Sequence, residues 1–255
     1  LLMTNGSLIF CPGPRSDRKV RGGWLAIVAS LSLRLPLVSS IERFYERRHR
    51  RANDVGMKLE QIRWGILGCG DVTEVKSGPA VMNRGDGGDD SRVVACMRRD
   101  GAKAEDYAKR HGVDRWYDDA DALLADKEVN AVYIATPPNG HRALALKVAA
   151  AGKACYVEKP FGRNAAEARE MVDAFAAADL PLLVAYYRRR LPRFVEAKRL
   201  IDADELGSVT SVDYEMTRLF QPDRDHGWRA DPTIAGGVLF HDLGSHLLDL
   251  LDFLL

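Results

Sequence analysis

The stretch IRWGILGCGDVT, residues 62 to 73, decides the fold. Its first part, Ile62 to Leu67, is a short apolar run that is typical of a buried β-strand. The run leads into Gly68-Cys69-Gly70-Asp71-Val72-Thr73, a GxGxx pattern with Thr73 where a third Gly or Ala is usual. Glycines at such a turn let a pyrophosphate approach the N-terminus of the next helix. The pattern predicts a dinucleotide site, although an ordinary strand-to-helix turn also fits it.

Strand and helix patterns alternate after this turn. An apolar strand at 92–97 begins about 20 residues after the glycines, as in dinucleotide-binding units. A helix is expected at 101–111, with a glycine at its end, and another near 119–126. The apolar run 131–135 is a third strand. Alternation of this kind predicts an α/β protein with a Rossmann-type doubly wound parallel sheet.

The residues after the second strand bear on the choice of dinucleotide. An acid usually stands there to bind the ribose 2′-hydroxyl of NAD, but this chain reads Arg98-Arg99-Asp100. Guanidinium groups suit a 2′-phosphate, so NADP is favoured as the cofactor. Two solvated surface arginines are the plain alternative. Asp100 could still bind the ribose, which keeps NAD possible.

Two further strand ends carry polar residues. The strand 131–135 is followed by Thr136-Pro137-Pro138-Asn139-Gly140-His141 and then by a helix expected at 142–151. The strand 154–157 ends in Glu158-Lys159-Pro160. The carboxyl ends of parallel strands face the ligand in such sheets, so an acid and a base there indicate a site, with a surface ion pair as the alternative.

A helix is expected at 242–255. Asp242, His246 and Asp249 would share one face of it, because residues three and four apart lie together. Leucines cover the rest of the helix, and unpaired buried charge is costly, so the three polar residues need partners. A metal site lacks a third nearby His or Cys and is not predicted. The pattern also fits a structural role for His246, as a histidine buried in the core with its hydrogen bonds made.

Six ordered motifs together resemble the glucose–fructose oxidoreductase/inositol dehydrogenase (Gfo/Idh/MocA) family. They are GILGCGDV at 65–72, ATPPNGH at 135–141, EKP at 158–160, YYRRRLP at 186–192, GWRAD at 227–231 and GGVLFHDLGSHLLD at 236–249. The resemblance implies an NAD(P)-dependent oxidoreductase acting on a secondary alcohol or ketone of a sugar, cyclitol or cyclic diol. Val238 replaces the third glycine that is usual at 236–238, and its side chain would limit the approach of the backbone to the substrate.

The resemblance also assigns roles. Lys159 would bind the reacting oxygen, His246 would transfer the proton, and Asp242 would orient His246 or bind a neighbouring hydroxyl. The cofactor would be bound by the glycine turn, Arg98 and Arg99, the loop 136–141 with Asn139 and His141, and Glu158, with Arg189, Trp228 and Arg229 nearby. The Lys159–Pro160 bond can be cis in this family, since a cis bond before proline costs only ~0.5–1 kcal/mol.

Charge and composition divide the chain. Residues 1–56 carry a balance of +6 and the remainder −5, so nothing favours a nucleic-acid partner. We expect a disordered N-terminal extension at 1–56, with a targeting leader as the alternative, a dinucleotide-binding domain at 57–187 and an incomplete α+β substrate domain at 188–255. No run reaches the ~18 apolar residues of a membrane span. Four cysteines without metal spacing suggest free thiols and a cytoplasmic protein.

The end of the chain leaves alternatives open. Only one clear strand of the second domain, at 209–219, is evident, so the chain is expected to be a C-terminally truncated form with an unpaired strand edge and an uncovered apolar helix. The full-length form would be a homo-oligomer. Two other readings remain: a relative that uses bound NAD to hydrolyse glycosides, and a cofactor-binding fragment without catalysis.

Overall fold

The computed structural model describes residues 2–4, 7–9, 26–33, 61–77, 91–219, 227–237 and 240–255. The chain divides into two compact units. The first, which we call the sheet unit, comprises Val55–Tyr186 and Trp228–Leu247. The second, the strand–helix unit, comprises Leu1–Asp54, Tyr187–Gly227 and Leu248–Leu255. Trp228–Leu247 therefore groups with the sheet, whereas the sequence assigns it to the second domain.

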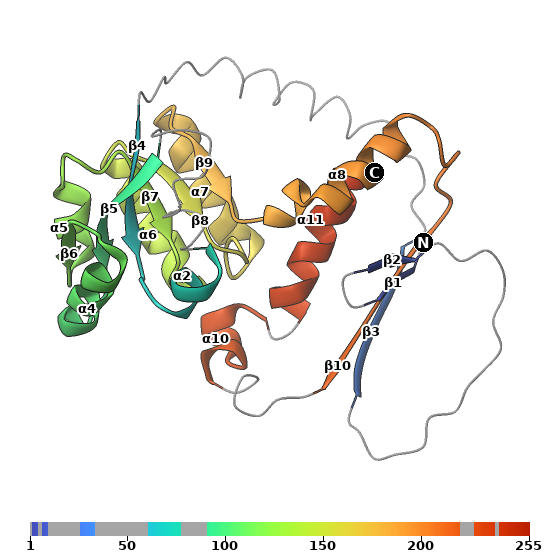
Figure 1. The fold of residues 1–255 in the computed structure, drawn as a ribbon, viewed down its shortest axis with the longest axis horizontal. Coiled ribbons are helices and arrows are strands. Elements are labelled where there is room, and N and C mark those ends of the chain that lie inside the picture. The colour runs from blue at the N-terminus through green and yellow to red at the C-terminus, as the bar shows by residue number, and fades with distance from the viewer. Residues whose placement is uncertain are drawn as a thin grey trace. The chain divides into compact units, whose positions relative to one another are not determined.

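A six-stranded parallel sheet forms the centre of the sheet unit (Figure 1). Its strands are β4 (Ile62–Leu67), β5 (Ser91–Met97), β6 (Arg115–Tyr117), β7 (Ala131–Ile134), β8 (Ala154–Val157) and β9 (Leu182–Val184). They lie in the order β6-β5-β4-β7-β8-β9. The order runs outward in both directions from β4 and β7, which confirms the predicted doubly wound fold. Ligands bind such sheets where the order reverses, beyond the carboxyl ends of these two strands.

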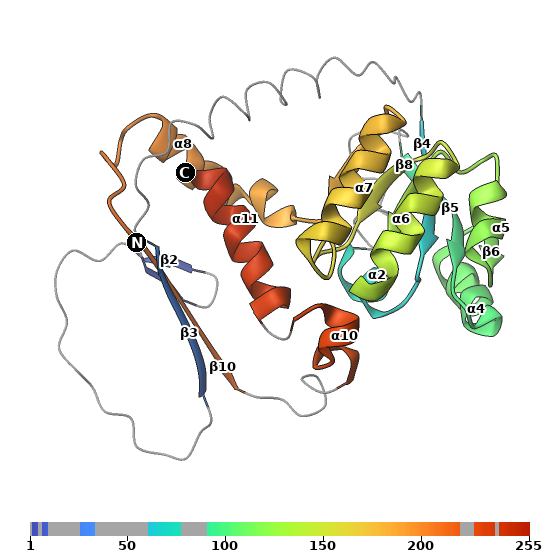
Figure 2. The ribbon, with the colours of Figure 1, turned by 180° about the vertical axis from the view of Figure 1, so that it is seen from behind.

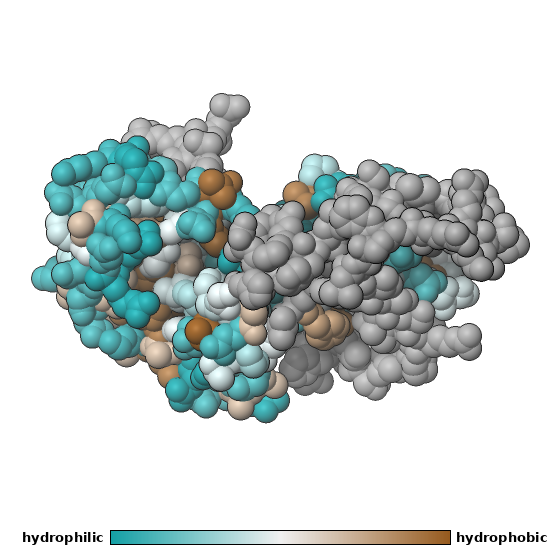
Figure 3. All heavy atoms as spheres, turned by 90° about the horizontal axis from the view of Figure 1, so that it is seen from below, coloured by the Kyte–Doolittle hydropathy of each residue, from teal (hydrophilic) through white to brown (hydrophobic). Residues whose placement is uncertain are grey.

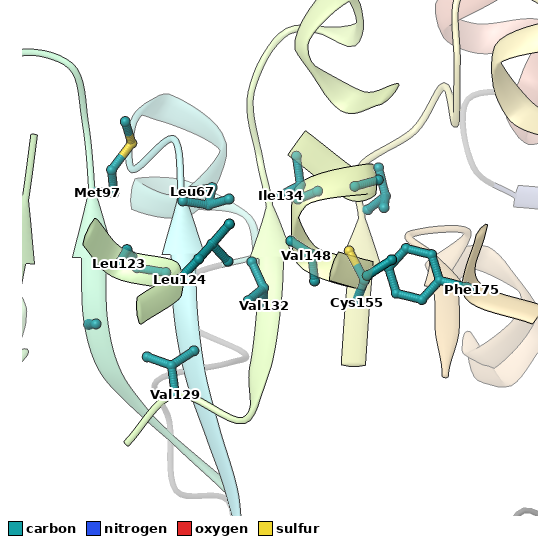
Figure 4. Packing of buried hydrophobic residues seen from close by; sticks show 14 of the residues in the cluster. Leu67, Met97, Leu123, Leu124, Val129, Val132, Ile134, Val148, Cys155 and Phe175 are labelled. Atoms are coloured by element: carbon teal, nitrogen blue, oxygen red, sulfur yellow. The ribbon is translucent and has the colours of Figure 1, made fainter. Parts of the chain in front are cut away.

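Two apolar cores hold the helices to the faces of this sheet. One core joins Leu67, Ile134 and Val157 of the strands to α5 (Ala120–Ala125), α6 (His141–Ala150) and α7 (Ala165–Ala177). Figure 4 shows Val148 of α6 beside Cys155 of β8, with Phe175 of α7 beyond it. The other core joins Ile66, Cys69, Cys96 and Tyr133 to α4 (Gly101–His111). Neighbouring residues along a strand point to opposite faces, so a single apolar run serves both cores.

Local signals set the helix ends. Asp100 caps α4 by accepting a hydrogen bond from the backbone N–H of Lys103, and Gly112 ends it with a φ of 63°. The last turn carries Lys109, Arg110 and His111, which suits the negative end of the helix dipole. These signals explain why the predicted bounds 101–111 are confirmed.

Several elements depart from the predicted pattern. β6, β9, α7 and α8 (Pro192–Asp202) were not predicted. The predicted helix at 242–255 begins instead as a π-helical turn, Phe240–Gly244, and continues as α11 (Ser245–Leu254). Gly244 permits the wide turn, because a Cβ there would lie 3.0 Å from the Phe240 ring. The remaining short elements are α2 (Asp71–Val75) and α10 (Pro232–Ala235).

The described part of the strand–helix unit contains four strands. Its strands are β1 (Leu2–Thr4), β2 (Ser7–Ile9), β3 (Ala26–Leu33) and β10 (Val212–Leu219). β10 pairs antiparallel with β3 along its whole length. In this two-stranded sheet β10 remains an edge strand, so the predicted unpaired edge is not contradicted among the described residues. Three strands therefore lie within residues 1–56, whose other residues fall outside the described part. The helices α8 and α11 pack through Phe194, Ala197, Leu250 and Leu254.

The face drawn in Figure 3 is mainly polar where it is coloured. Hydrophilic residues cover much of the coloured surface in Figure 3, where hydrophobic residues form small separate patches. Figure 2 gives the ribbon from behind. Among the described residues, none of the helices has the length and apolarity needed to cross a membrane.

Candidate active site

The glycine turn after β4 is shaped by Gly68 and Thr73. Gly68 has a φ of 95°, and a Cβ there would lie 2.8 Å from the Thr136 methyl group, so this position requires glycine. Thr73 is fully buried, and its hydroxyl accepts from Gly70 N at 2.9 Å and donates to Gly70 O at 2.8 Å. Thr73 therefore caps α2 at the position where the dinucleotide pattern usually has a small residue.

Gly70 has a different character from Gly68. Its backbone is extended, and a Cβ there would meet nothing within 4 Å. Packing within the protein therefore places no demand on glycine at this position. Open space above the turn is what a closely approaching pyrophosphate would need.

The loop 136–141 follows β7, the neighbour of β4, and lies next to the turn. The Thr136 hydroxyl is buried and, among the described residues, has no hydrogen-bond partner. A Cβ on Gly140 would lie 3.0 Å from it. Asn139 is exposed, whereas His141 is fully buried. An orphaned buried hydroxyl costs free energy unless a ligand or water satisfies it, so Thr136 is a candidate ligand-binding group.

His141 fastens this loop to the segment after β8. Its ring nitrogens lie 2.8 Å from Thr136 O and 3.0 Å from Pro160 O. Burial lowers the pKa of the imidazole, although the three neighbouring carbonyls oppose the shift. Sequence reasoning predicted a cofactor contact for His141. Its hydrogen bonds support a positioning role for the ring, and the predicted cofactor contact stays a prediction.

A hydrogen bond from Tyr133 positions the Glu158 carboxylate. The Tyr133 hydroxyl donates to Glu158 Oε1 and lies 2.6 Å from Ser77 Oγ. The other carboxylate oxygen of Glu158 accepts from the backbone N–H of Lys159 at 3.1 Å. Burial and the neighbouring carboxylate raise the pKa of Tyr133, so the hydroxyl keeps its proton for this bond. Sequence reasoning missed Tyr133, whose strand reads as uniformly apolar.

Lys159 and Asp242 form an ion pair at the end of β8. The Lys159 ammonium donates to Asp242 Oδ1 and lies 3.4 Å from the Asp242 carbonyl oxygen. The side chain of Lys159 is only 19% exposed. Burial alone would raise the pKa of Asp242, but Lys159, then Arg229 and His246, outweigh it and hold that pKa below its ordinary value. The Lys159–Pro160 bond is cis, as the resemblance implied.

His246 lies in the first turn of α11 and is 3% exposed. Its ring meets the Tyr186 ring edge-on, with centroids 5.9 Å apart. An electrostatic interaction with His246 contributes to the low pKa of Asp242, which pairs with Lys159. The three residues therefore lie in one neighbourhood, although the resemblance alone had paired Asp242 with His246 only.

Trp228 and Arg229 lie beside Asp242. The Arg229 guanidinium lies 4.3 Å from the centre of the Trp228 ring, a cation–π arrangement. Both residues line a small hollow together with Pro138, Pro160 and Asp242. Trp228 and Arg229 therefore lie beside Asp242 in the sheet unit, and their predicted place near the cofactor stays a prediction.

The glycine pair at 236–237 serves packing. A Cβ on Gly236 would lie 2.5 Å from Arg163 Cα, so the backbone of this segment passes directly over the residues that follow Pro160. Arg163 Nη1 donates to Thr233 O at 3.0 Å, and His241 Nε2 lies 3.0 Å from Gly162 O. The sequence suggested that these glycines admit substrate. In the structure the close neighbour of Gly236 is Arg163, and Val238 lies outside the described residues.

The end of β5 presents two arginines. Arg98 is half-buried, and its Nη1 lies 3.4 Å from Cys69 O of the glycine turn, whereas Arg99 is exposed. Asp100 accepts from Lys103 N and pairs with the Lys103 ammonium at 3.1 Å. The Asp100 carboxylate, which the sequence offered as an alternative ligand for the ribose, is therefore bound to Lys103 in this structure.

Arg189 and Asp249 form an ion pair. Arg189 Nε donates to Asp249 Oδ1 at 2.8 Å, and its Nη2 donates to Asp252 Oδ2 at 2.9 Å. All three belong to the strand–helix unit. The predicted cofactor role of Arg189 thus stays a prediction. Within the described residues, no group of three His, Cys, Asp or Glu is arranged to bind a metal ion.

Comparison with known proteins assigns the family. Residues 62–186 match the model described as oxidoreductase family, NAD-binding Rossmann fold (GFO_IDH_MocA), and residues 194–255 match the GFO/IDH/MocA C-terminal domain. The chain belongs to the Gfo/Idh/MocA family.

Relatives and solved structures agree with this. The chain is 41% identical over 195 residues to Oxidoreductase P35 of Formosa agariphila, matching 75% of this chain and 60% of that protein. It is 34% identical over 188 residues to trans-1,2-dihydrobenzene-1,2-diol dehydrogenase of Bos taurus, matching 73% and 54%. An NAD-binding oxidoreductase from Klebsiella pneumoniae superposes with a TM-score of 0.64 and 28% identity, over 76% of this chain and 53% of that one. The chain therefore spans between about half and 60% of the length of these relatives.

Proposed function

We propose that this chain provides the cofactor site and the catalytic residues of an NAD(P)-dependent oxidoreductase. Its reaction would move a hydride between a nicotinamide dinucleotide and a secondary alcohol or ketone of a sugar, cyclitol or cyclic diol. The observation that carries the proposal is the grouping of Lys159, Asp242 and His246 beyond the carboxyl end of β8. A cytoplasmic homo-oligomer is the setting we expect for the whole protein.

The residues present fit a dinucleotide. The Gly68 turn stands where the strand order reverses, Gly70 leaves open space above it, and the Thr136 hydroxyl is buried without a partner among the described residues. When bound, a nicotinamide dinucleotide supplies the hydride donor or acceptor. Glu158, held by Tyr133, and the loop 136–141, held by His141, would support its nicotinamide half.

The three site residues divide the remaining chemistry. Lys159 would hydrogen-bond the reacting oxygen of the substrate and stabilise negative charge on it. His246 would take the hydroxyl proton during oxidation and return it during reduction, a task that suits imidazole near neutral pH. Asp242 stays ionised because Lys159 keeps its pKa low, so it can hold the ammonium in place.

Activity measured with cyclic diols and sugars tests these roles. Lys159→Ala and His246→Ala should each lower kcat by ~10²–10⁴-fold, as expected for acid–base groups, and leave dinucleotide binding within a few-fold of the parent. Arg169→Ala, on the exposed surface of α7, is the matched control. Full turnover by His246→Ala would show that another group transfers the proton.

NADP is the cofactor that this site favours. Two guanidinium groups at the end of β5 support binding of a 2′-phosphate, and Asp100 already caps α4 and pairs with Lys103. Fluorescence titration should therefore give tighter binding of NADPH than of NADH. Arg98→Asp should remove ~1.5–3 kcal/mol of the NADPH affinity, the range for a hydrogen bond to a charged group.

The control for this titration is Arg169→Asp, which changes the net charge equally but lies on α7. It should leave both affinities unchanged. Equal affinities for NADPH and NADH in the parent chain would refute the preference and leave the general dinucleotide site intact.

A further inference from the structure

A second contact lies beside the Lys159–Asp242 ion pair. The π-helical turn Phe240–Gly244 carries Asp242, and His241 is the residue before it. His241 Nε2 lies 3.0 Å from the carbonyl oxygen of Gly162, three residues after Lys159. The turn and the loop after β8 are therefore joined twice, once by the ion pair and once by this contact.

The contact with Gly162 fixes the proton on the His241 ring. A carbonyl oxygen accepts hydrogen bonds and cannot donate them, so Nε2 of His241 carries the proton and donates it. The side chain also packs against the backbone of Gly237, where a Cβ would lie 3.1 Å from His241 Cβ and 3.4 Å from its Cγ. His241 is therefore held both by a directed hydrogen bond and by the shape of its surroundings.

The loop that accepts this hydrogen bond is itself firmly held. Arg163, the residue after Gly162, donates from its backbone N–H and from Nε to the two carboxylate oxygens of Glu167, each at 2.9 Å. Glu167 is 7% exposed, and its backbone N–H donates to Asn164, the N-cap residue of α7. Arg163 also donates to Thr233 O at 3.0 Å. Gly162 is thus a well-anchored point from which the π-helical turn can be positioned.

We propose that His241 is a positioning residue for Asp242. Its hydrogen bond to Gly162 O holds the π-helical turn against the loop after β8, so that the Asp242 carboxylate meets the Lys159 ammonium. Single π-helical turns occur frequently at functional sites. The effect of His241 on the ion pair follows from the geometry, whereas its effect on turnover rests on the proposed function.

The ion pair needs this support because a lysine ammonium is a poor guide to direction. It can donate along any of three N–H bonds at the end of a flexible stem, so it leaves the orientation of the carboxylate loosely defined. A directed bond from the neighbouring residue removes much of that freedom. Misplacement of a site residue by about 1 Å can cost about a hundredfold in rate. Loss of the His241 bond should therefore loosen the ion pair and slow turnover.

Two substitutions separate the hydrogen bond of His241 from the packing of its ring. His241→Phe keeps a ring beside Gly237 and removes the donor, whereas His241→Gln removes the ring and keeps an N–H near the place of Nε2. We expect His241→Phe to lower kcat by ~10-fold or more with little change in NADPH affinity, and His241→Gln to recover most of the loss. Lys147→Ala removes an exposed ion pair with Asp121 and should match the parent.

Acetylation of lysines reports the ion pair without any substrate. The parent and both variants are treated briefly with acetic anhydride, and their peptides are quantified by mass spectrometry with the exposed Lys109 as the internal reference. In the parent, Lys159 is paired and only 19% exposed, so it should react slowly. Its acetylation relative to Lys109 should rise several-fold in His241→Phe and return toward the parent value in His241→Gln.

Urea unfolding establishes that each variant is folded, and His241→Asn replaces His241→Phe if the latter does not fold, because the shorter amide leaves Gly162 O without a donor. Unchanged kcat and unchanged Lys159 acetylation in the folded variant that lacks the donor would overturn the proposal. So would a His241→Gln chain that is more impaired than His241→Phe, the order expected for packing alone. If the parent turned over no sugar or diol with either dinucleotide, the proposed function would fail, while the acetylation pattern would still decide whether His241 sets the ion pair.

Discussion

Gly68 and Gly70 stand two residues apart in one turn, yet they meet different demands. Gly68 adopts a φ of 95° against Thr136, whereas Gly70 is extended and faces open space. The backbone conformation and packing of the free protein therefore require glycine at position 68 but not at position 70. The second is free to serve a ligand.

A pair of alanine substitutions separates these demands. Gly68→Ala should destabilise the sheet unit by ~2–4 kcal/mol, because left-handed backbone strain adds to a clash with Thr136. Gly70→Ala should change the free energy of unfolding by less than ~0.5 kcal/mol, as for an unstrained open site, but lower NADPH affinity. Gly152→Ala, at a φ of 68° with no neighbour within 4 Å, measures the strain alone. Unchanged NADPH affinity in a folded Gly70→Ala chain would move the pyrophosphate away from this turn.

Glu74 makes the folded protein sensitive to acid. Its carboxylate accepts hydrogen bonds from Arg110 at 2.6 and 3.0 Å, contacts His111 as well, and joins α2 to α4. The bonds from Arg110 lower its pKa from 4.5 to about 2, against the opposing effect of burial. A carboxyl group with a depressed folded pKa stabilises the protein above its unfolded pKa and loses that contribution as pH falls.

Glu74→Gln tests this coupling by urea unfolding at several pH values. The variant should be less stable than the parent by about 1 kcal/mol at pH 7, after allowance for solvent screening of a partly exposed pair. The difference should persist down to pH 4.5 and disappear toward pH 2. Glu105→Gln removes an exposed pair with Lys109 on the same helix and should cost only a few tenths of a kcal/mol at pH 7. A difference that stays constant down to pH 2 would contradict the assignment.

At the scale of elements, α11 illustrates how a polar residue is kept in an apolar helix. Asp249 is 8% exposed, and burial raises its pKa even though Arg189 opposes the shift. Its Oδ2 has no hydrogen-bond partner within the described residues. The ion pair with Arg189 therefore decides whether the charge on this helix is tolerated.

Arg189→Met should keep the packing of the side-chain stem near Phe253 but leave the Asp249 charge unpaired. Because Arg189 is partly exposed, we expect a loss of ~1–3 kcal/mol rather than the larger cost of a fully buried pair. Hydrogen exchange of the α8 and α11 amides reports the loss. Asp249→Asn in the same chain should recover part of it. Arg199→Met, whose partners Glu196 and Glu205 are exposed, should have little effect on these amides.

For the molecule as a whole, the proposed cofactor contacts fall within the sheet unit, apart from Arg189. Saturating NADPH, at 100 times its dissociation constant, should stabilise the binding-competent fold by about 2.7 kcal/mol. Hydrogen exchange should therefore slow most at the ends of β4, β5 and β7, with little change in β10. Strong protection of residues 187–190 would instead assign Arg189 to the cofactor site, as the sequence suggests.

The sequence by itself determined the parallel sheet and most of its helices. Apolar runs that end in Gly68, Arg98, Thr136 and Glu158 are local signals, and each of these strands ends within one residue of its pattern. The cap and basic last turn of α4 are equally local, so its approximate bounds could be predicted. Lys159, Asp242 and His246 were found because short motifs keep their residue types and order.

Only the tertiary structure decided which polar groups meet. The bond between Tyr133 and Glu158 and the ion pair between Lys159 and Asp242 join residues 25 and 83 positions apart, and no local pattern encodes such contacts. The same holds for β10, whose partner β3 lies in residues that composition alone describes as an extension. Periodicity reports which face of an element is buried, but the partner of a buried polar group depends on how distant segments pack, and that is decided by the free energy of the whole fold.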